Sequence, residues 1–219
     1  NRNSQYVWLI DFDSDFRASG AGTGIDSGDN FTRTSGTLNA DKDYDFNGGV
    51  DVSNLTTGNI LAGFDLFEDK DQVEIDFLIA PAMVSRADQT TVVNDLVSTA
   101  ASTRKDCVVV TSPARSDVVN VTSASTAVTN TIATADTFTK SSYLFMDNNY
   151  LKVYDKFNDQ FIDIPAASST AGIMAATDLN RAPWFSPAGS RRGQYFGITS
   201  LAYTPTKSQR DQLYRAGVN

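Results

Sequence analysis

The chain of 219 residues contains no histidine and only one cysteine. Without histidine, Ser-His-Asp and Cys-His hydrolases, H-E-x-x-H metalloproteases and ordinary His-ligated zinc sites are all excluded. The single cysteine, Cys107, opens the apolar run Cys107–Val110, where a buried small hydrophobic residue is expected rather than a nucleophile. No disulfide framework can form, which fits assembly in a reducing cytosol. The chemistry that stays open is that of carboxylates, lysines or oxygen-ligated metals, or no chemistry at all.

Long apolar runs and an excess of positive charge are also missing. No window approaches the ~18 consecutive apolar residues of a membrane span, and the start, NRNSQYVWLIDF, lacks the basic and apolar regions of a signal peptide. Eighteen Lys and Arg face 26 Asp and Glu, and this net charge of −8 argues against nucleic acid or an anionic membrane as a partner. With 41% hydrophobic and 20% charged residues, the composition is that of a globular protein.

Strand and helix patterns alternate from about residue 55 onward, which predicts an α/β fold: a layered, mixed, largely parallel sheet flanked by helices. Strands are expected at Gln72–Ala80, Cys107–Thr111 and Tyr195–Tyr203, and helices at Ser53–Phe67, Ser85–Ser102, Asp117–Ala135 and from Pro165 to about Asn180. The segment Tyr143–Tyr154 is predicted to form a hairpin around Asp147-Asn148-Asn149, and Phe161–Ile164 a further short strand. Thr206 and Gln209 form a capping box for a last helix, which ends at Gly217.

Residues 1–52 differ from the rest, and we expect them to be a β-rich, loop-rich segment of a preceding domain, followed by an α/β core domain over 53–219. Their stretch Asp41–Asn47 imitates a calcium loop, with Asp41, Asp43 and Asp45 at ligand positions. Phe46 stands where the sharp turn of that loop needs glycine, and Val52 stands where a bidentate glutamate should be. A solvated acidic turn is therefore expected there, with loose cation binding as the alternative.

The loops at the carboxyl ends of the predicted parallel strands are where a ligand site would lie in such a fold. They carry Arg86, Asp88, Arg115 and Asp117. Opposite charges at helix starts are typical of caps and surface pairs, so we expect no active site there. A carboxylate pair for glycoside hydrolysis stays open, because the separation of two acids is a property of the fold. No catalytic residue, cofactor site or metal site is predicted.

The stretch from Pro165 to Gly193 changes character at Arg181, after its predicted helix. Pro183 and Pro187 remove two backbone donors and hold the chain extended, so the segment is neither helix nor central strand. Trp184 and Phe185 are large aromatics that need a packing surface. We therefore predict a rigid connection with Trp184, Phe185, Pro187 and Gly189 as structural anchors, and a cost of about 3–5 kcal/mol for Trp184→Ala through a core cavity.

The same region carries a resemblance to a known family. The order of a helix, Arg181, PWFSPAG, RRG, a strand and RDQLYRAGVN resembles the core domain of the contractile tail sheath proteins of myophages, over about residues 71–219. The resemblance implies a non-enzymatic structural subunit of the virion tail, assembled in the host cytoplasm. Its partners would be copies of itself in stacked six-subunit rings, the tail tube and the baseplate, and contraction would drive the tube through the host envelope.

Three further expectations accompany this resemblance. In the family the chain continues past the G-V-N junction, whereas this sequence stops at Asn219, so we expect a core fragment that stays monomeric in dilute solution. Arg191 and Arg192, a basic doublet, are expected to contact an acidic neighbour or to form a solvated turn. Two other classes stay open: a calcium-dependent adhesion or surface-layer module, and an acidic carbohydrate-active enzyme.

Overall fold

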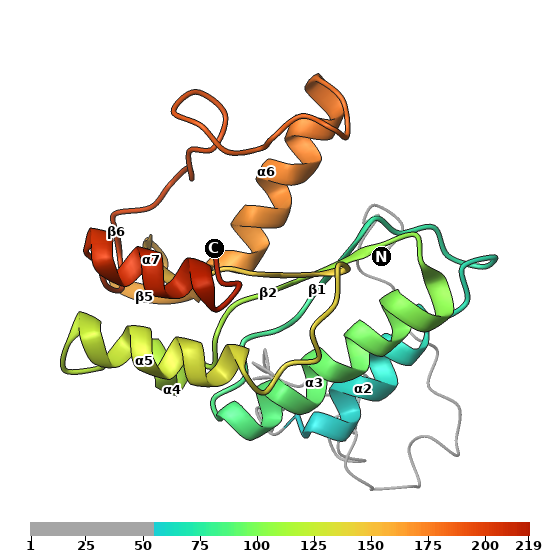
Figure 1. The fold of residues 1–219 in the computed structure, drawn as a ribbon, viewed down its shortest axis with the longest axis horizontal. Helices are drawn as coiled ribbons and strands as arrows, with labels where there is room; N and C mark the ends of the chain where they lie inside the picture. Colours follow the sequence, from blue (N-terminus) through green and yellow to red (C-terminus); the bar gives the residue numbers. More distant parts are fainter. Residues whose placement is uncertain (1–54) are drawn as a thin grey trace, which may run out of the picture. The chain divides into compact units, whose positions relative to one another are not determined.

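A computed structural model describes residues 55–219 of the chain (Figure 1). The predicted β-rich segment 1–52, with its candidate calcium loop at Asp41–Asn47, lies outside the described residues. The helices are α2 (Thr57–Asp65), α3 (Arg86–Ser98), α4 (Arg115–Val118), α5 (Ala124–Ala135), α6 (Ala166–Asn180) and α7 (Lys207–Arg215), with a π-helical turn, η1, over Thr99–Arg104. The strands are β1 (Phe77–Ile79), β2 (Val108–Thr111), β3 (Leu144–Met146), β4 (Tyr150–Asp155), β5 (Gln160–Pro165) and β6 (Ser200–Leu201).

The predicted α/β class is confirmed, but the strands form two sheets rather than one. The first sheet is parallel, in the order β1-β2-β3. The second is antiparallel, in the order β5-β4-β6. The hairpin predicted over Tyr143–Tyr154 is therefore wrong, because β3 pairs with β2 while β4 pairs with β5 and β6. The turn Asp147-Asn148-Asn149 instead carries the chain from one sheet to the other.

Strand β2 lies at the centre of the core. Val109 belongs to the main cluster, which includes Val93 and Leu96 of α3, while its neighbour Val110 packs with Ala167 and Ala171 of α6. Because successive side chains of a strand point to opposite faces, β2 is covered by α3 on one side and by α6 on the other (Figure 1). Cys107 lies in the main cluster and is buried, as predicted.

Hydroxyl side chains set the starts of the helices. Thr56, Ser85 and Ser123 each accept a hydrogen bond from a backbone N–H three residues ahead, which satisfies a donor that has no partner within the helix. The capping box of Thr206 and Gln209 at the start of α7 is present as predicted. Gly217, which follows α7, has a φ of 79°, a conformation that favours glycine.

Three expected elements are shorter or broken. The predicted helix over Asp117–Ala135 is divided into α4 and α5, with Asn120 between them at a φ of 62°. Only Phe77–Ile79 of the expected strand Gln72–Ala80, and only Ser200–Leu201 of Tyr195–Tyr203, pair with another strand. Among the described residues, no helix is both long enough and apolar enough to cross a membrane.

Candidate functional site

The region around α6 contains the residues that the sequence singles out. The helix begins after Pro165, and Ala167 N–H donates to Ser112 Oγ at 3.0 Å, which fixes its first turn to the end of β2. Arg181 ends the helix in a non-helical conformation, with a φ of −134° and a ψ of −92°. The chain then leaves α6 as an extended loop that reaches β6 only at Ser200 (Figure 1).

The anchor role predicted for Trp184 is wrong for the described chain, because its side chain is 83% exposed. Phe185 is also exposed, at 43%. The loop is shaped by its own short hydrogen bonds instead: Phe185 N–H donates to Ala182 O at 3.0 Å, and Gly193 N–H to Gly189 O at 2.8 Å. Removal of Trp184 leaves no core cavity, so the large cost expected for Trp184→Ala does not apply.

The glycines of this loop have a clear structural reason. Gly189 has a φ of 130°, a conformation that side chains rarely adopt. A Cβ at Gly193 would lie 3.0 Å from Gly189 N and 3.1 Å from Pro187 O, so a larger residue would push the turn open. Gly189 and Pro187 thus shape the loop, although they do not pin it to a core.

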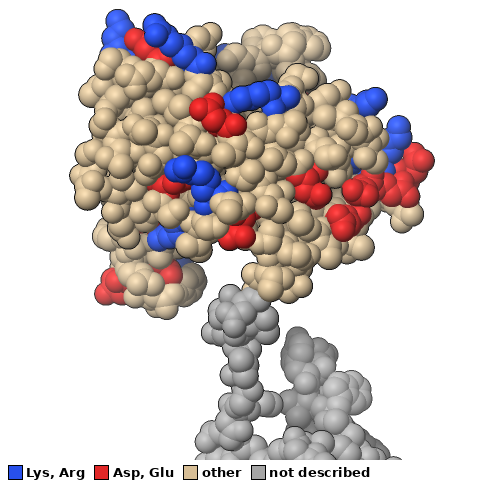
Figure 2. Space-filling view, turned by 60° about the horizontal axis from the view of Figure 1, so that its bottom comes forward, with Lys and Arg blue, Asp and Glu red and all other residues tan. Residues whose placement is uncertain are grey.

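The basic doublet lies on this loop. Arg191 and Arg192 are exposed, and neither forms an ion pair with the described residues. The Arg192 guanidinium lies 5.6 Å from the centre of the Phe185 ring, a cation–π contact. On the face of the molecule in Figure 2, basic side chains lie close to acidic ones, so that charges of both signs are available for contacts.

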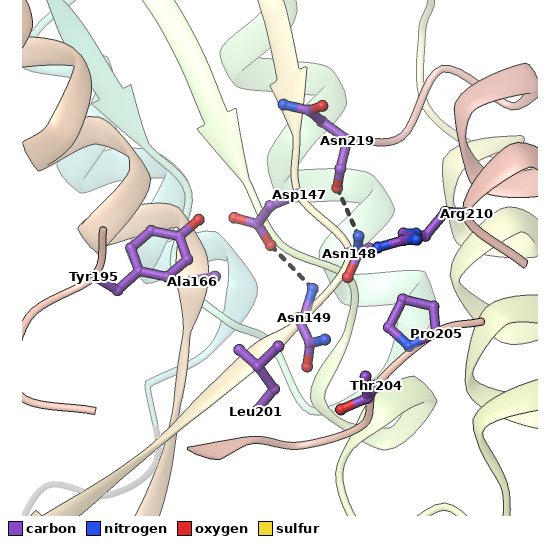
Figure 3. Close-up of a pocket in the computed structure, with 10 residues that line it drawn as sticks. All are labelled: Asp147, Asn148, Asn149, Ala166, Tyr195, Leu201, Thr204, Pro205, Arg210 and Asn219. Atoms are coloured by element: carbon purple, nitrogen blue, oxygen red, sulfur yellow. Dashed lines mark hydrogen bonds between the residues drawn. The ribbon is translucent and has the colours of Figure 1, made fainter. Parts of the chain in front are cut away.

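A pocket of about 340 Å³ opens where the two sheets meet (Figure 3). Its inner wall is Asp147, which follows β3 directly and is buried. Ser112 Oγ donates to Asp147 Oδ1 at 2.8 Å, and Asn149 N–H approaches the same oxygen at 3.4 Å. Asp147 Oδ2 has no hydrogen-bond partner among the described residues. Burial raises the pKa of this carboxyl to about 7, against the opposing effect of the Ser112 and Asn149 hydrogen bonds.

The asparagines beside Asp147 join distant parts of the chain. Asn149 Nδ2 donates to Tyr203 O at 2.8 Å, and Tyr203 Oη donates to Asn148 O at 3.0 Å. Asn148 Nδ2 donates to Asn219 O at 2.8 Å, and Asn219 N–H donates to Met146 O at 2.9 Å (Figure 3). These bonds make the pocket a joint between the first sheet, the second sheet and the end of α7.

The chemistry of this joint is limited. Asp147 is the only acid that lines the pocket, and the other lining groups are amides, hydroxyls, apolar side chains and Arg210. A glycosidase needs two carboxyl groups on either side of the scissile bond, and this pocket offers one. Within the described range, no cluster of three or more acidic or cysteine side chains could hold a metal ion.

The charged loop residues considered in the sequence have structural roles. Arg86 pairs with the buried Asp117 at 2.8 Å, and Thr134 Oγ1 also donates to Asp117. Asp88 accepts hydrogen bonds from Ser85 and Thr57, and these hold its pKa below the usual range. Arg115 donates to Asp163 O of β5 at 2.9 Å. These side chains connect separate elements rather than capping helices, and Asp117 is buried rather than part of the expected surface pair.

A second cavity of about 340 Å³ lies between the C-terminal half of α6, the starts of β1 and β2, and the proline loop. Most of its lining residues are apolar, and its three acidic residues, all exposed, form what we call its rim; the cavity is named the α6 groove. It is lined by Phe77, Met174, Pro183, Phe185 and Pro187, and by the carboxylates Asp76, Asp106 and Asp178. This groove has no signature in the sequence, because its residues come from four separate segments.

The described residues form an α/β domain in which buried polar side chains connect the helices and strands. Residues 53–219 match the family model of the phage tail sheath protein central domain. The chain belongs to this family.

Individual relatives agree with this assignment. The chain is 33% identical over 175 residues to the tail sheath protein of Enterobacteria phage T4, a match that covers 75% of this chain and 26% of that protein. It is 33% identical over 190 residues to the tail sheath protein of Vibrio phage KVP40, covering 80% of this chain and 28% of that protein. The chain thus spans about a quarter of the length of these relatives.

A solved structure shares the fold. The cryo-EM structure of the anti-feeding prophage baseplate contains a chain that superimposes with a TM-score of 0.51, covering 74% of this chain and 37% of that one. The sequence identity is 18%, so this likeness concerns the fold. The resemblance to sheath proteins noted in the sequence is confirmed by the family match and the two phage relatives.

Proposed function

We propose that this chain is the core of a structural subunit that polymerises around a phage tail tube and shortens to drive the tube through the host envelope. The observation that carries the proposal is the match of residues 53–219 to the central domain of phage tail sheath proteins. Tail sheath proteins are components of the virion tail, and we place this protein there, assembled in the host cytoplasm from copies of itself beside the tube and baseplate.

The described structure supports a mechanical rather than a catalytic role. Buried polar groups are used as ties: Asp117 holds α4 to α3 and α5, and Asn149 holds the two sheets together. Large apolar side chains, among them Phe157 and Trp184, are instead left exposed. A stiff core with exposed aromatic side chains suits a subunit whose contacts with other copies rearrange as rigid bodies.

The proposal is tested by expressing the complete protein that contains this chain and examining it by negative-stain electron microscopy. We expect regular tubes with a helical arrangement of subunits. If the polymer shortens, tubes with the same number of subunits should occur in two lengths. Antibodies raised against the 219-residue chain should label the outer surface of these tubes. Monodisperse particles over a wide range of salt and protein concentration, without tubes, would contradict the proposal.

The two other classes are not favoured by the comparisons. A calcium-dependent adhesion module predicts a rise in melting temperature when calcium is added, and a carbohydrate-active enzyme predicts hydrolysis of a polysaccharide panel. We expect neither result from this chain.

A further inference from the structure

The described residues leave the α6 groove open to another chain. Its apolar lining, Phe77, Met174 and Phe185, is only partly covered by the rest of the described chain. Asp76 and Asp178 on its rim are exposed and make no ion pair with the described residues, whereas Asp106 is paired with Arg104 at 3.0 Å. A partner that fits this groove must therefore bring a bulky apolar side chain to its centre and a positive charge to its rim.

The turn between β4 and β5 presents these two groups together. Phe157 is 87% exposed, and the Lys156 ammonium lies 5.1 Å from the centre of its ring. Lys156 forms no ion pair with the described residues. We call this pair of residues the hairpin tip.

The hairpin tip is held in shape before any contact is made. Asp155 Oδ1 accepts from Phe157 N–H at 3.0 Å, Asp155 Oδ2 accepts from Asn158 Nδ2 at 2.6 Å, and Tyr154 donates to Asp159. Both acids of the turn are thus engaged locally. A turn that is already ordered loses little conformational entropy when it binds, which favours its use as a contact.

We propose that the hairpin tip of one copy inserts into the α6 groove of the next, with Phe157 on the apolar floor and Lys156 between Asp76 and Asp178. This inference rests on the proposed function and names the surfaces that would make one of its contacts. The two surfaces belong to different parts of the chain: β5 runs into α6, so that the turn before β5 and the far end of α6 are separated by both elements (Figure 1).

Repetition of this contact from copy to copy would build a polymer. Because the groove and the tip are different surfaces, each copy offers one of each to two different neighbours. Contacts of this head-to-tail kind close into rings or continue as helices, whereas a contact between identical surfaces stops at a dimer. Trp184 and Leu179 are exposed and directly follow the groove residues Pro183 and Asp178 in the sequence, so they would be available to extend the apolar contact.

Cysteine cross-linking of the 219-residue chain tests the contact directly. One variant carries Gln160→Cys, at the exposed first residue of β5 next to the hairpin tip, and the other carries Ala182→Cys in the lining of the groove; the native Cys107 is buried. The two are mixed in equal amounts, oxidised, and the disulfide-linked dimer is followed on a non-reducing gel. We expect dimer to form at least about tenfold faster than for the control pair, because a disulfide requires the two Cα atoms to come within about 7 Å.

The control pair replaces Gln160→Cys by Gln212→Cys on α7, beside the exposed Tyr214 and Arg215. This site also offers an exposed aromatic ring next to a cation, but on a helix flank rather than a protruding turn. Adding Phe157→Ala to the Gln160→Cys variant should reduce cross-linking to the control rate. Lys156→Glu should slow it as well, and Asp178→Lys in the partner should restore it. Equal rates for the test and control pairs, or no effect of Phe157→Ala, would overturn the contact.

The two proposals can fail separately. If the complete protein forms tubes while the cross-link stays at the control rate, the groove contact is wrong and the sheath role stands. If the cross-link forms and the complete protein gives no tubes, the contact stands and the sheath role is wrong.

Discussion

Asp147 is the residue whose charge state should most affect stability. Its pKa is raised to about 7 by burial in the folded chain, whereas the ordinary value is 3.8. The folded state therefore binds a proton more tightly than the unfolded state, and the stability due to this proton is complete below about pH 4 and is lost as pH rises through about 7. We expect Asp147→Asn to be more stable than the wild type at pH 8, by up to about 4 kcal/mol. Urea unfolding at pH 5 and pH 8 measures the difference.

A matched control separates this effect from the loss of any acid. Asp211→Asn removes an exposed carboxylate from α7 and should leave the pH dependence of the wild type unchanged. Asparagine at 147 keeps an oxygen that can accept from Ser112 Oγ, so the hydrogen bond of the joint is preserved. If Asp147→Asn and the wild type lose the same stability between pH 5 and pH 8, the carboxyl is not the titrating group.

Single residues differ in whether their position in the fold can be predicted from the sequence. Cys107 is predictable, because its apolar neighbours leave a buried position as the simplest interpretation. Trp184 is not, since proline fixes the backbone of its loop without deciding whether the ring faces the core or another chain. Asp147 follows a strand of a parallel sheet, where ligand sites gather, but its place there depends on the pairing of β3 with β2.

For the helices and strands, sequence signals within one segment predicted the structure well, whereas the pairing of strands was predicted wrongly. Hydroxyl caps and helical periodicity predicted α2, α3 and α7 to within a few residues, and a proline followed by helix-forming residues predicted α6. These signals act within a single segment. The short β3 and β4 read as a hairpin because a turn separates them, yet each pairs with a strand elsewhere in the sequence. The division into two sheets depends on those long-range pairs, which no local pattern contains.

One buried arginine ties the segment after α2 to the sheet. The Arg104 side chain is fully buried, and it donates to Phe67 O at 2.6 Å and to Val73 O at 2.8 Å as well as to Asp106. We expect Arg104→Met to lower the melting temperature by at least about 5 °C, since it leaves two carbonyls and a carboxylate without their donor. Hydrogen exchange should accelerate in α2 and in residues 66–76 before the rest of the chain.

Lys70→Met is the matched variant for this test. It removes a cation of the same segment, but Lys70 is exposed and makes no ion pair with the described residues. Its melting temperature should stay within about 1 °C of the wild type, because exposed charges contribute little. An equal fall in melting temperature in both variants would show that the charge of the segment matters rather than the buried hydrogen bonds of Arg104.

For the whole molecule, the surface predicts weak self-association of this chain alone. It spans about a quarter of the length of its sheath relatives, so it can carry only part of the contacts that a subunit makes. The exposed apolar side chains are distributed over several segments, among them α6 with the proline loop, the β4–β5 turn and α7. The net charge of −8 opposes close approach of copies. A polymer becomes stable when several weak contacts act together, and one contact without the others dissociates readily. Sedimentation velocity at micromolar concentration should therefore show a monomer, even though the groove contact can be captured by a disulfide. Stable hexamers or tubes formed by the 219-residue chain would show that its described surfaces are sufficient for assembly.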